Sequence, residues 1–140
     1  MTDLTLSVSR VIKASPQRVF EAWLDPTMLA RFMLAGPGMT VPEVKTDPKA
    51  GGRFSILMRM GDNDLPHGGT YLELVPHSRI VFSWESPYSI DGSTVTVALA
   101  PKGDGTMVTL THVRFPSVES RDNHASGWTA ILAQLATELE

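Results

Sequence analysis

Residues 117–140 read SVESRDNHASGWTAILAQLATELE and contain no proline. Their large apolar residues recur at i, i+3, i+4, i+7 and i+11, the spacing of one helical face: Trp128, Ile131, Leu132, Leu135 and Leu139. Ser117 and Ser120 are suitable N-caps, and Glu119 and Asp122 suit the positive end of a helix dipole. This stretch predicts one long C-terminal helix with a single apolar face.

Gly127 lies inside this predicted helix, next to Trp128. A glycine in a helix interior costs about 1 kcal/mol of stability relative to alanine. We therefore expect another segment of the protein to approach the helix backbone closely at Gly127.

Most of the sequence before the helix predicts strands. Apolar and polar residues alternate there, as in strands with one buried face, over 4–8, 39–43, 54–60, 70–75, 80–85, 94–100 and 107–114. Ser15-Pro16 and Asp25-Pro26 each combine an N-cap with a proline in the first turn, which predicts two short helices after the first strand. A hairpin turn or longer loop at 61–64 and a turn at 103–105 favour antiparallel pairing. The order predicts an α+β domain whose curved antiparallel sheet of about six strands is covered by the C-terminal helix.

The composition favours a small, ordinary globular domain. A chain of 140 residues with 42% hydrophobic and 19% charged residues predicts a single domain over 1–140. The net charge of -3 argues against nucleic-acid and anionic-membrane partners. The absence of cysteine excludes disulfides and thiolate chemistry, and no apolar run reaches the ~20 residues of a membrane span. We expect a cytoplasmic protein, and an exposed edge strand leaves a homodimer open.

Several short motifs, taken in order, resemble one family across nearly the whole chain. They are RVIKASP at 10–16, VFEAW at 19–23, Asp25-Pro26, GGRF at 51–54, GTYLE at 69–73, TVTV at 94–97, and Gly127-Trp128 with Leu132 and Leu135. The sequence resembles the START-like (SRPBCC) superfamily of polyketide cyclases and lipid-transfer proteins. Within it, the chain is most similar to the C-terminal domain of the activator of heat-shock-protein-90 ATPase.

The resemblance implies a helix-grip fold with an apolar cavity between the sheet and the C-terminal helix, entered near the two short helices. Phe32 stands where relatives usually have tryptophan, and Met33 and Leu34 follow it, so we expect an adaptable apolar segment near the entrance. The residues expected to line the cavity are Trp23, Phe32, Phe54, Ile56, Met58, Met60, Tyr71, Phe82, Trp84, Val97, Leu110, His112, His124, Trp128 and Ile131.

No motif in the sequence predicts a metal, a cofactor or a catalytic residue. The four histidines (His67, His77, His112 and His124) do not have the spacing of a zinc site. Gly51-Gly52 is not followed by the Lys-Ser/Thr and helix of a phosphate-binding loop, so it predicts a turn. We expect neither a metal nor a cofactor.

Among the polar residues, His112 is the one for which the sequence allows the most different roles. Strand parity places it with Val108 and Leu110, facing the helix, with His124 as a potential neighbour. It is either a hydrogen-bonded core histidine, the commoner case, or a ligand-orienting donor or general base beside a carboxylate. Arg10, which shares the apolar parity of the first strand, and Glu73 are expected to form a structural ion pair.

Three functions follow from these observations. The first is non-catalytic binding of a small hydrophobic or aromatic ligand in the cavity. The second is a cyclase- or dehydratase-like enzyme that uses the same cavity. The third, a stress-response role with heat shock protein 90, is the weakest, because the activator uses an additional N-terminal domain whereas the first strand here is expected to start at Leu4.

Overall fold

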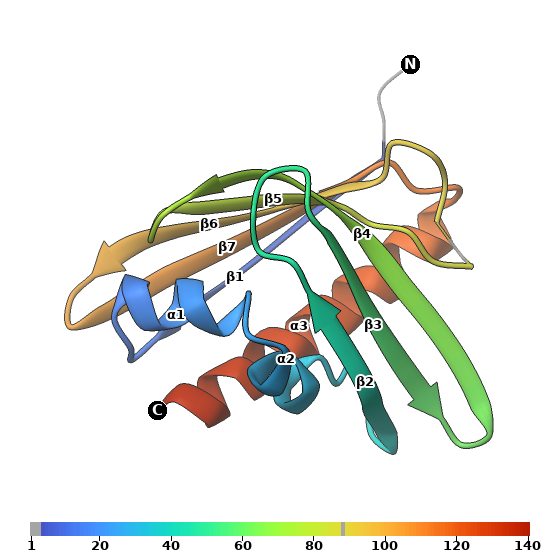
Figure 1. Cartoon of the computed structure of the whole chain (residues 1–140), viewed down its shortest axis with the longest axis horizontal. Coiled ribbons are helices and arrows are strands. Elements are labelled where there is room, and N and C mark those ends of the chain that lie inside the picture. The colour runs from blue at the N-terminus through green and yellow to red at the C-terminus, as the bar shows by residue number, and fades with distance from the viewer. Residues whose placement is uncertain (1–3, 88) are drawn as a thin grey trace.

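The computed structural model describes residues 4–87 and 89–140, and these form one curled antiparallel sheet with three helices (Figure 1). The seven strands pair in the order β1-β7-β6-β5-β4-β3-β2. In chain order the elements are β1 (Thr5–Ile12), α1 (Pro16–Ala22), α2 (Pro26–Phe32), β2 (Met39–Thr46), β3 (Arg53–Met60), β4 (Asn63–Val75), β5 (Arg79–Ser83), β6 (Thr94–Lys102), β7 (Gly105–Val113) and α3 (Val118–Leu139). This is the expected helix-grip architecture.

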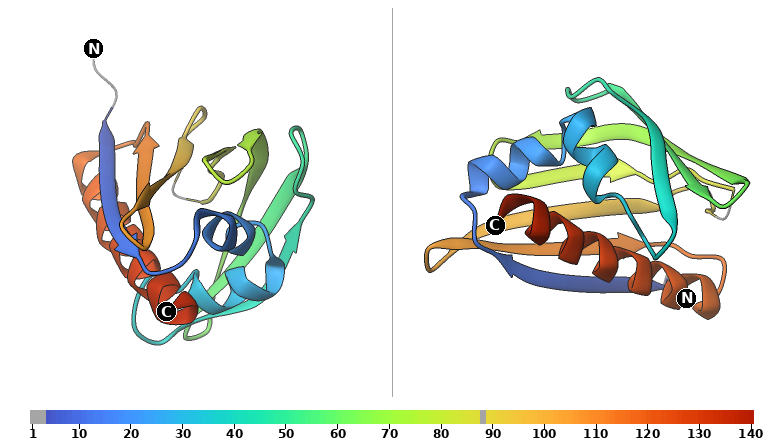
Figure 2. Two further views of the ribbon diagram at one scale, coloured as in Figure 1. Left: turned by 90° about the vertical axis from the view of Figure 1, so that its left-hand side faces the viewer. Right: turned by 90° about the horizontal axis from the view of Figure 1, so that it is seen from below.

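The sheet curls around α3, and the two short helices lie at the open side of the curl (Figure 2). α3 contacts β1 and α2, and α2 contacts β2. The apolar stripe of α3 is buried: Trp128, Ile131, Leu132, Leu135 and Leu139 all belong to the core. Because one face of the sheet and one face of α3 are both apolar, packing them together removes both from water.

The helices begin where the N-cap residues predicted them. Ser15 Oγ accepts a hydrogen bond from the Arg18 backbone N–H at 3.2 Å, and Asp25 Oδ1 accepts one from Thr27 at 2.9 Å. Ser117 Oγ accepts from the Ser120 N–H at 3.1 Å. These bonds satisfy N–H groups that the first helical turn leaves without partners.

β4 is longer than the sequence predicted: the strand expected over 70–75 begins at Asn63, inside the turn or loop expected over 61–64. Met60 pairs with Asn63, so the hairpin turn is only Gly61 and Asp62, with Gly61 at φ +60°. Pro66 lies in this extension, opposite Leu57. It is tolerated because β5 pairs with β4 only from Tyr71 onward, apart from one bridge at Gly68, so this half of β4 is a sheet edge.

Two further expectations differ from the structure. β2 continues through Pro42 to Thr46, which an edge strand with a local register shift allows. The Arg10–Glu73 pair does not form: Arg10 is exposed, and Glu73 accepts a 2.8 Å hydrogen bond from Nε of Arg79 instead. Leu6 and Ile12 share the parity of Arg10 on this edge strand and are buried, so parity alone did not decide the exposure of Arg10.

Among the residues described, no helix combines the length and the apolar character needed to cross a bilayer.

Candidate functional site

His112 on β7 is fully buried and holds two elements together through its ring. The indole Nε1–H of Trp128 on α3 donates to His112 Nδ1 at 3.0 Å. Since an indole nitrogen only donates, Nδ1 must be the acceptor, and the neutral ring carries its proton on Nε2. That N–H donates to Ser93 Oγ at 2.6 Å. Burial, followed by the nearby His124, lowers the pKa of His112 to about 3.

This geometry makes His112 a hydrogen-bonded core residue. Both ring nitrogens are engaged, and no carboxylate is among their partners. A general base needs a nitrogen with a free lone pair within reach of substrate, and a ligand-orienting donor needs a free N–H. His112 offers neither, because its lone pair is directed at Trp128 and its N–H at Ser93.

We expect Ser93→Ala to lower the free energy of unfolding by about 1–3 kcal/mol, because it leaves the buried Nε2–H of His112 without an acceptor. Urea denaturation of both proteins at pH 7 measures the difference. A conservative control is Ser93→Thr, which keeps the hydroxyl. A loss from Ser93→Ala no greater than that of Ser93→Thr would contradict the assignment.

A pocket of about 280 Å³ opens between α3 and the β3–β4 half of the sheet. Its lining is predominantly apolar and includes two tryptophans, with two histidines and one asparagine as its polar members: Ala35, Met39, Met58, Leu65, His67, Trp84, Asn123, His124, Gly127, Trp128 and Ile131. We call this the Trp84–Trp128 pocket. The two indole rings have centroids 4.9 Å apart, so they form one continuous aromatic wall.

Only some of the residues expected to line a cavity lie along this pocket: Met58, Trp84, His124, Trp128 and Ile131. A second group surrounds a gap of only about 10 Å³, which is packed core: Trp23, Phe54, Ile56, Tyr71 and Phe82. Phe32, Val97, Leu110 and His112 are buried in the core and line neither space. Met60 is half-buried at the end of β3 and also lines neither.

The segment after α2 differs from the expectation of an adaptable apolar entrance. Phe32 and Met33 are fully buried, and the Phe32 ring packs edge-on against Trp23 at 5.1 Å. Ala35 and Met39, further along, reach the pocket instead. The turn of the chain after α2 therefore forms part of the pocket wall, while Phe32 anchors α2 to the core.

Several lining residues were not predicted from the sequence: Ala35, Met39, Leu65, His67, Asn123 and Gly127. His67 and Leu65 lie on the part of β4 that precedes the strand predicted over 70–75. Gly127 was the one useful signal, because its position in a helix required a close neighbour. A Cβ at Gly127 would lie 3.3 Å from Cβ of Ala35, so the expected close approach is made by the segment after α2.

The polar groups of the pocket are partly engaged with backbone. His67 Nδ1 lies 2.8 Å from the Leu65 carbonyl oxygen, and His124 Nδ1 lies 2.8 Å from that of Ser120. The His67 ring packs against Trp84, with centroids 5.0 Å apart. Burial lowers the pKa of His67, partly offset by the bond to Leu65, with a further lowering by His124. In the described part of the chain, the buried Trp84 Nε1–H has no hydrogen-bond partner.

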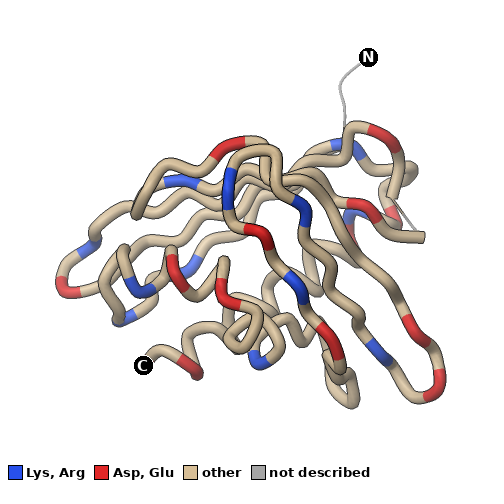
Figure 3. Tube along the Cα trace, in the orientation of Figure 1, with Lys and Arg blue, Asp and Glu red and all other residues tan. Residues whose placement is uncertain are grey.

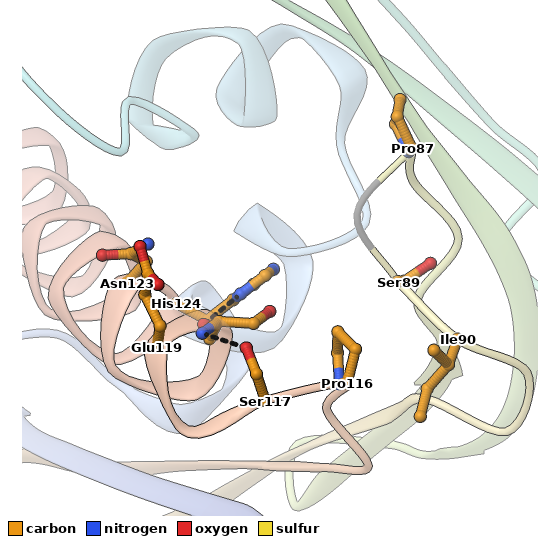
Figure 4. A pocket seen from close by; sticks show the side chains of 9 residues that line it. Pro87, Ser89, Ile90, Pro116, Ser117, Glu119, Asn123 and His124 are labelled. Carbon is orange, nitrogen blue, oxygen red and sulfur yellow. Dashed lines mark hydrogen bonds between the residues drawn. The ribbon is translucent and has the colours of Figure 1, made fainter.

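A second, more polar pocket of about 550 Å³ lies beside the start of α3 (Figure 4). Pro87, Ser89 and Ile90 of the β5–β6 connection line one side of it. The other side is formed by Pro116, Ser117 and the first turns of α3. Asn123 and His124 line both pockets, so these two side chains separate the polar space from the apolar one.

Charged side chains are interspersed by sign along the tube of Figure 3. Among the described residues that line the Trp84–Trp128 pocket, none is Lys, Arg, Asp or Glu. Across the described residues, no group of three or more His, Asp or Glu is placed to hold a metal ion. The chemistry available in the pocket is therefore apolar contact, aromatic stacking and neutral hydrogen bonding.

The comparisons with protein families and with solved structures agree with each other. A model of the family described as activator of Hsp90 ATPase homolog 1-like protein matches residues 13–140. No curated protein matches the sequence significantly. Protein CV1439 from Chromobacterium violaceum is 30% identical with a TM-score of 0.87, and the alignment covers 97% of this chain and 96% of that one.

Two other solved structures agree with this assignment. Protein Mll3558 from Rhizobium loti is 31% identical with a TM-score of 0.82, over 98% of this chain and 97% of that one. The AHSA1-like protein from Aeromonas hydrophila is 26% identical with a TM-score of 0.83, over 98% and 96%. With the family model spanning nearly all of the sequence and the helix-grip fold present, the chain belongs to the activator of Hsp90 ATPase homolog 1-like family of the START-like (SRPBCC) superfamily.

Proposed function

We propose that this protein is a non-catalytic binding domain for a small hydrophobic or aromatic molecule, which it holds in the Trp84–Trp128 pocket. The observation that carries the proposal is an apolar space of about 280 Å³ walled by two tryptophans in contact. Ligand pockets are typically apolar clefts with a few placed polar groups, and this one has that composition. Its volume lies just below the usual range of roughly 300–1,000 Å³, which favours a one- or two-ring molecule over a long lipid.

The lining suits a flat ring system in particular. Trp84 and Trp128 line the pocket, and an aromatic ligand in contact with their rings gains about 0.5–1.5 kcal/mol per ring pair beyond area burial. Met39 and Met58 complete the wall with flexible thioether chains that adapt to irregular shapes. His112 supports the site indirectly, because its bond to Trp128 fixes the orientation of that indole ring.

The test is calorimetric titration of the protein with naphthalene derivatives, comparing two substitutions on the same strand. Leu65→Trp places a larger side chain in the pocket wall on β4, and we expect it to weaken binding at least about tenfold, a loss of about 1.4 kcal/mol. Leu72→Trp, also on β4, is the matched control, because Leu72 is 52% exposed and does not line the pocket. It should leave the affinity unchanged.

Two results would end the proposal. One is the absence of binding by every naphthalene derivative tested at millimolar concentration. The other is an equal loss of affinity in Leu65→Trp and Leu72→Trp, which would place the binding outside the pocket.

A further inference from the structure

The two histidines of the pocket share one tautomer. A backbone carbonyl oxygen only accepts hydrogen bonds, so the contacts of His67 Nδ1 with Leu65 and of His124 Nδ1 with Ser120 require the proton on Nδ1 in both rings. In the neutral form, each Nε2 then carries a lone pair. Among the described residues, neither Nε2 has a hydrogen-bond partner, so the pocket contains two hydrogen-bond acceptors that the protein does not use.

The rings of His67 and His124 also lie near each other at the pocket. Both line the Trp84–Trp128 pocket, and they are near enough for the charge of His124 to affect the titration of His67. His67 packs against Trp84, while His124 packs edge-on against His112 with centroids 5.3 Å apart. An aromatic molecule stacked along the indole wall therefore lies beside imidazole rings that can accept a hydrogen bond from it.

The same lining disfavours a charged ligand. No Lys or Arg is among the described lining residues, so a carboxylate entering the pocket loses water without gaining a cation. The lone pairs of neutral imidazoles repel it further. Burial holds His67 in its neutral form, since its pKa is lowered. A fatty acid or an aromatic acid is thus a poor match for this space, although its apolar part would fit.

We infer that the ligand of this pocket is an uncharged aromatic molecule with a hydroxyl group, whose O–H donates to an imidazole Nε2 of His67 or His124. The inference rests on the proposed function, because it names the ligand class of the same pocket. The apolar ring occupies the wall of Trp84 and Trp128, and the hydroxyl group lies toward the histidines. Recognition of a donor by two prepared acceptors distinguishes a phenol from its methyl ether, which has the same ring but no O–H.

Three probes with one ring system test this class by calorimetry at pH 8, which is above the ordinary pKa of an imidazole. They are 2-naphthol, 2-methoxynaphthalene and 2-naphthoate. We expect 2-naphthol to bind about tenfold more tightly than the methyl ether, the ratio for one hydrogen bond of about 1.4 kcal/mol, and the carboxylate to bind most weakly. Equal binding of naphthol and ether, or tightest binding of the carboxylate, would overturn the inference while leaving pocket binding intact. Binding of none of the three would instead remove the proposed function.

Two variants identify which histidine accepts the hydrogen bond from the ligand. His67→Phe and His124→Phe each keep a flat ring of similar shape and remove one Nε2. We expect the preference for naphthol over its methyl ether to fall toward one in at least one of these variants. The affinity for the ether reports separately on whether the pocket remains intact. A preference unchanged in both single variants and in the double variant would overturn the inference.

Discussion

Lowering the pH from 7 to 4.5 is expected to reduce the free energy of unfolding by about 2–3 kcal/mol through His112 alone. The pKa of this ring is about 3 in the folded protein, against an ordinary value of 6.5. Above pH 6.5 the ring is neutral in both states and contributes no pH dependence. Between pH 6.5 and 3 the unfolded chain binds a proton that the folded protein does not, so stability falls by about 1.4 kcal/mol per pH unit.

The structural reason is the bond between His112 and Trp128. Protonation of Nδ1 would place two N–H groups against each other at a distance of 3.0 Å between the nitrogens, inside the core. Urea unfolding at pH 7, 6, 5 and 4.5, for the wild type and His112→Gln, measures the effect. The wild type should lose stability more steeply than the variant, which is itself less stable at pH 7. Parallel pH profiles would exclude His112 as the source.

The pH range of this experiment matters because the protonation of other groups also lowers the free energy of unfolding as the pH falls. Hydrogen bonds from Arg59 and Arg53 lower the pKa values of Asp64 and Glu85, respectively, so their stabilisation is lost as the pH falls below about 4. The lowered pKa of His67 adds a smaller loss within the measured range. The comparison with His112→Gln removes both contributions, since the two proteins share them.

Gly69→Ala is expected to lower the free energy of unfolding by about 3 kcal/mol, the upper part of the range for overpacking a core. A Cβ at Gly69 would lie 2.0 Å from the carbonyl oxygen of Ser83 and 2.8 Å from ring atoms of Phe54. The oxygen belongs to backbone at the end of β5, and the ring is packed against Tyr71 and Phe82. Neither can move without opening the sheet where β4 leaves β3 to pair with β5.

Gly36→Ala is the matched control for this substitution. No heavy atom lies within 4 Å of a Cβ at Gly36, and its φ is not in the left-handed region, so we expect a change within about 0.5 kcal/mol. Thermal and urea unfolding of both variants at pH 7 give the comparison. Similar stabilities for the two alanine variants would show that the sheet adapts at Gly69 and that the close approach does not constrain the sequence there.

The candidate site could be predicted only in part from the sequence. Strand parity and the apolar face of the helix indicate which side chains face each other, and the family resemblance implied a cavity near Met58, Trp84 and Trp128. Parity does not indicate how far apart the two facing layers lie. Phe54 and Tyr71 face the same side as Trp84, yet the sheet and the helices close to a gap of about 10 Å³ around them.

The sequence by itself determined the elements and their order, because the signals for them are local. An N-cap followed by proline begins a helix wherever it occurs, and an apolar stripe such as that from Trp128 to Leu139 requires a covering partner. The helix-grip architecture follows from these elements and from the family motifs. Gly127 likewise indicated that another segment approaches the helix closely, but not which segment.

Only the tertiary structure decided the site, because its parts come from distant segments and irregular backbone. The pocket needs Ala35 from the turn after α2, His67 from a strand that becomes an edge where β5 ends, and His124 from α3. The tautomer of each histidine, by contrast, is set locally, by the carbonyl oxygen of Leu65 for His67 and of Ser120 for His124, each at 2.8 Å and only two or four residues earlier in the chain. The distances between Ala35, His67 and His124 arise from the packing of whole layers, and no local pattern of residues encodes them.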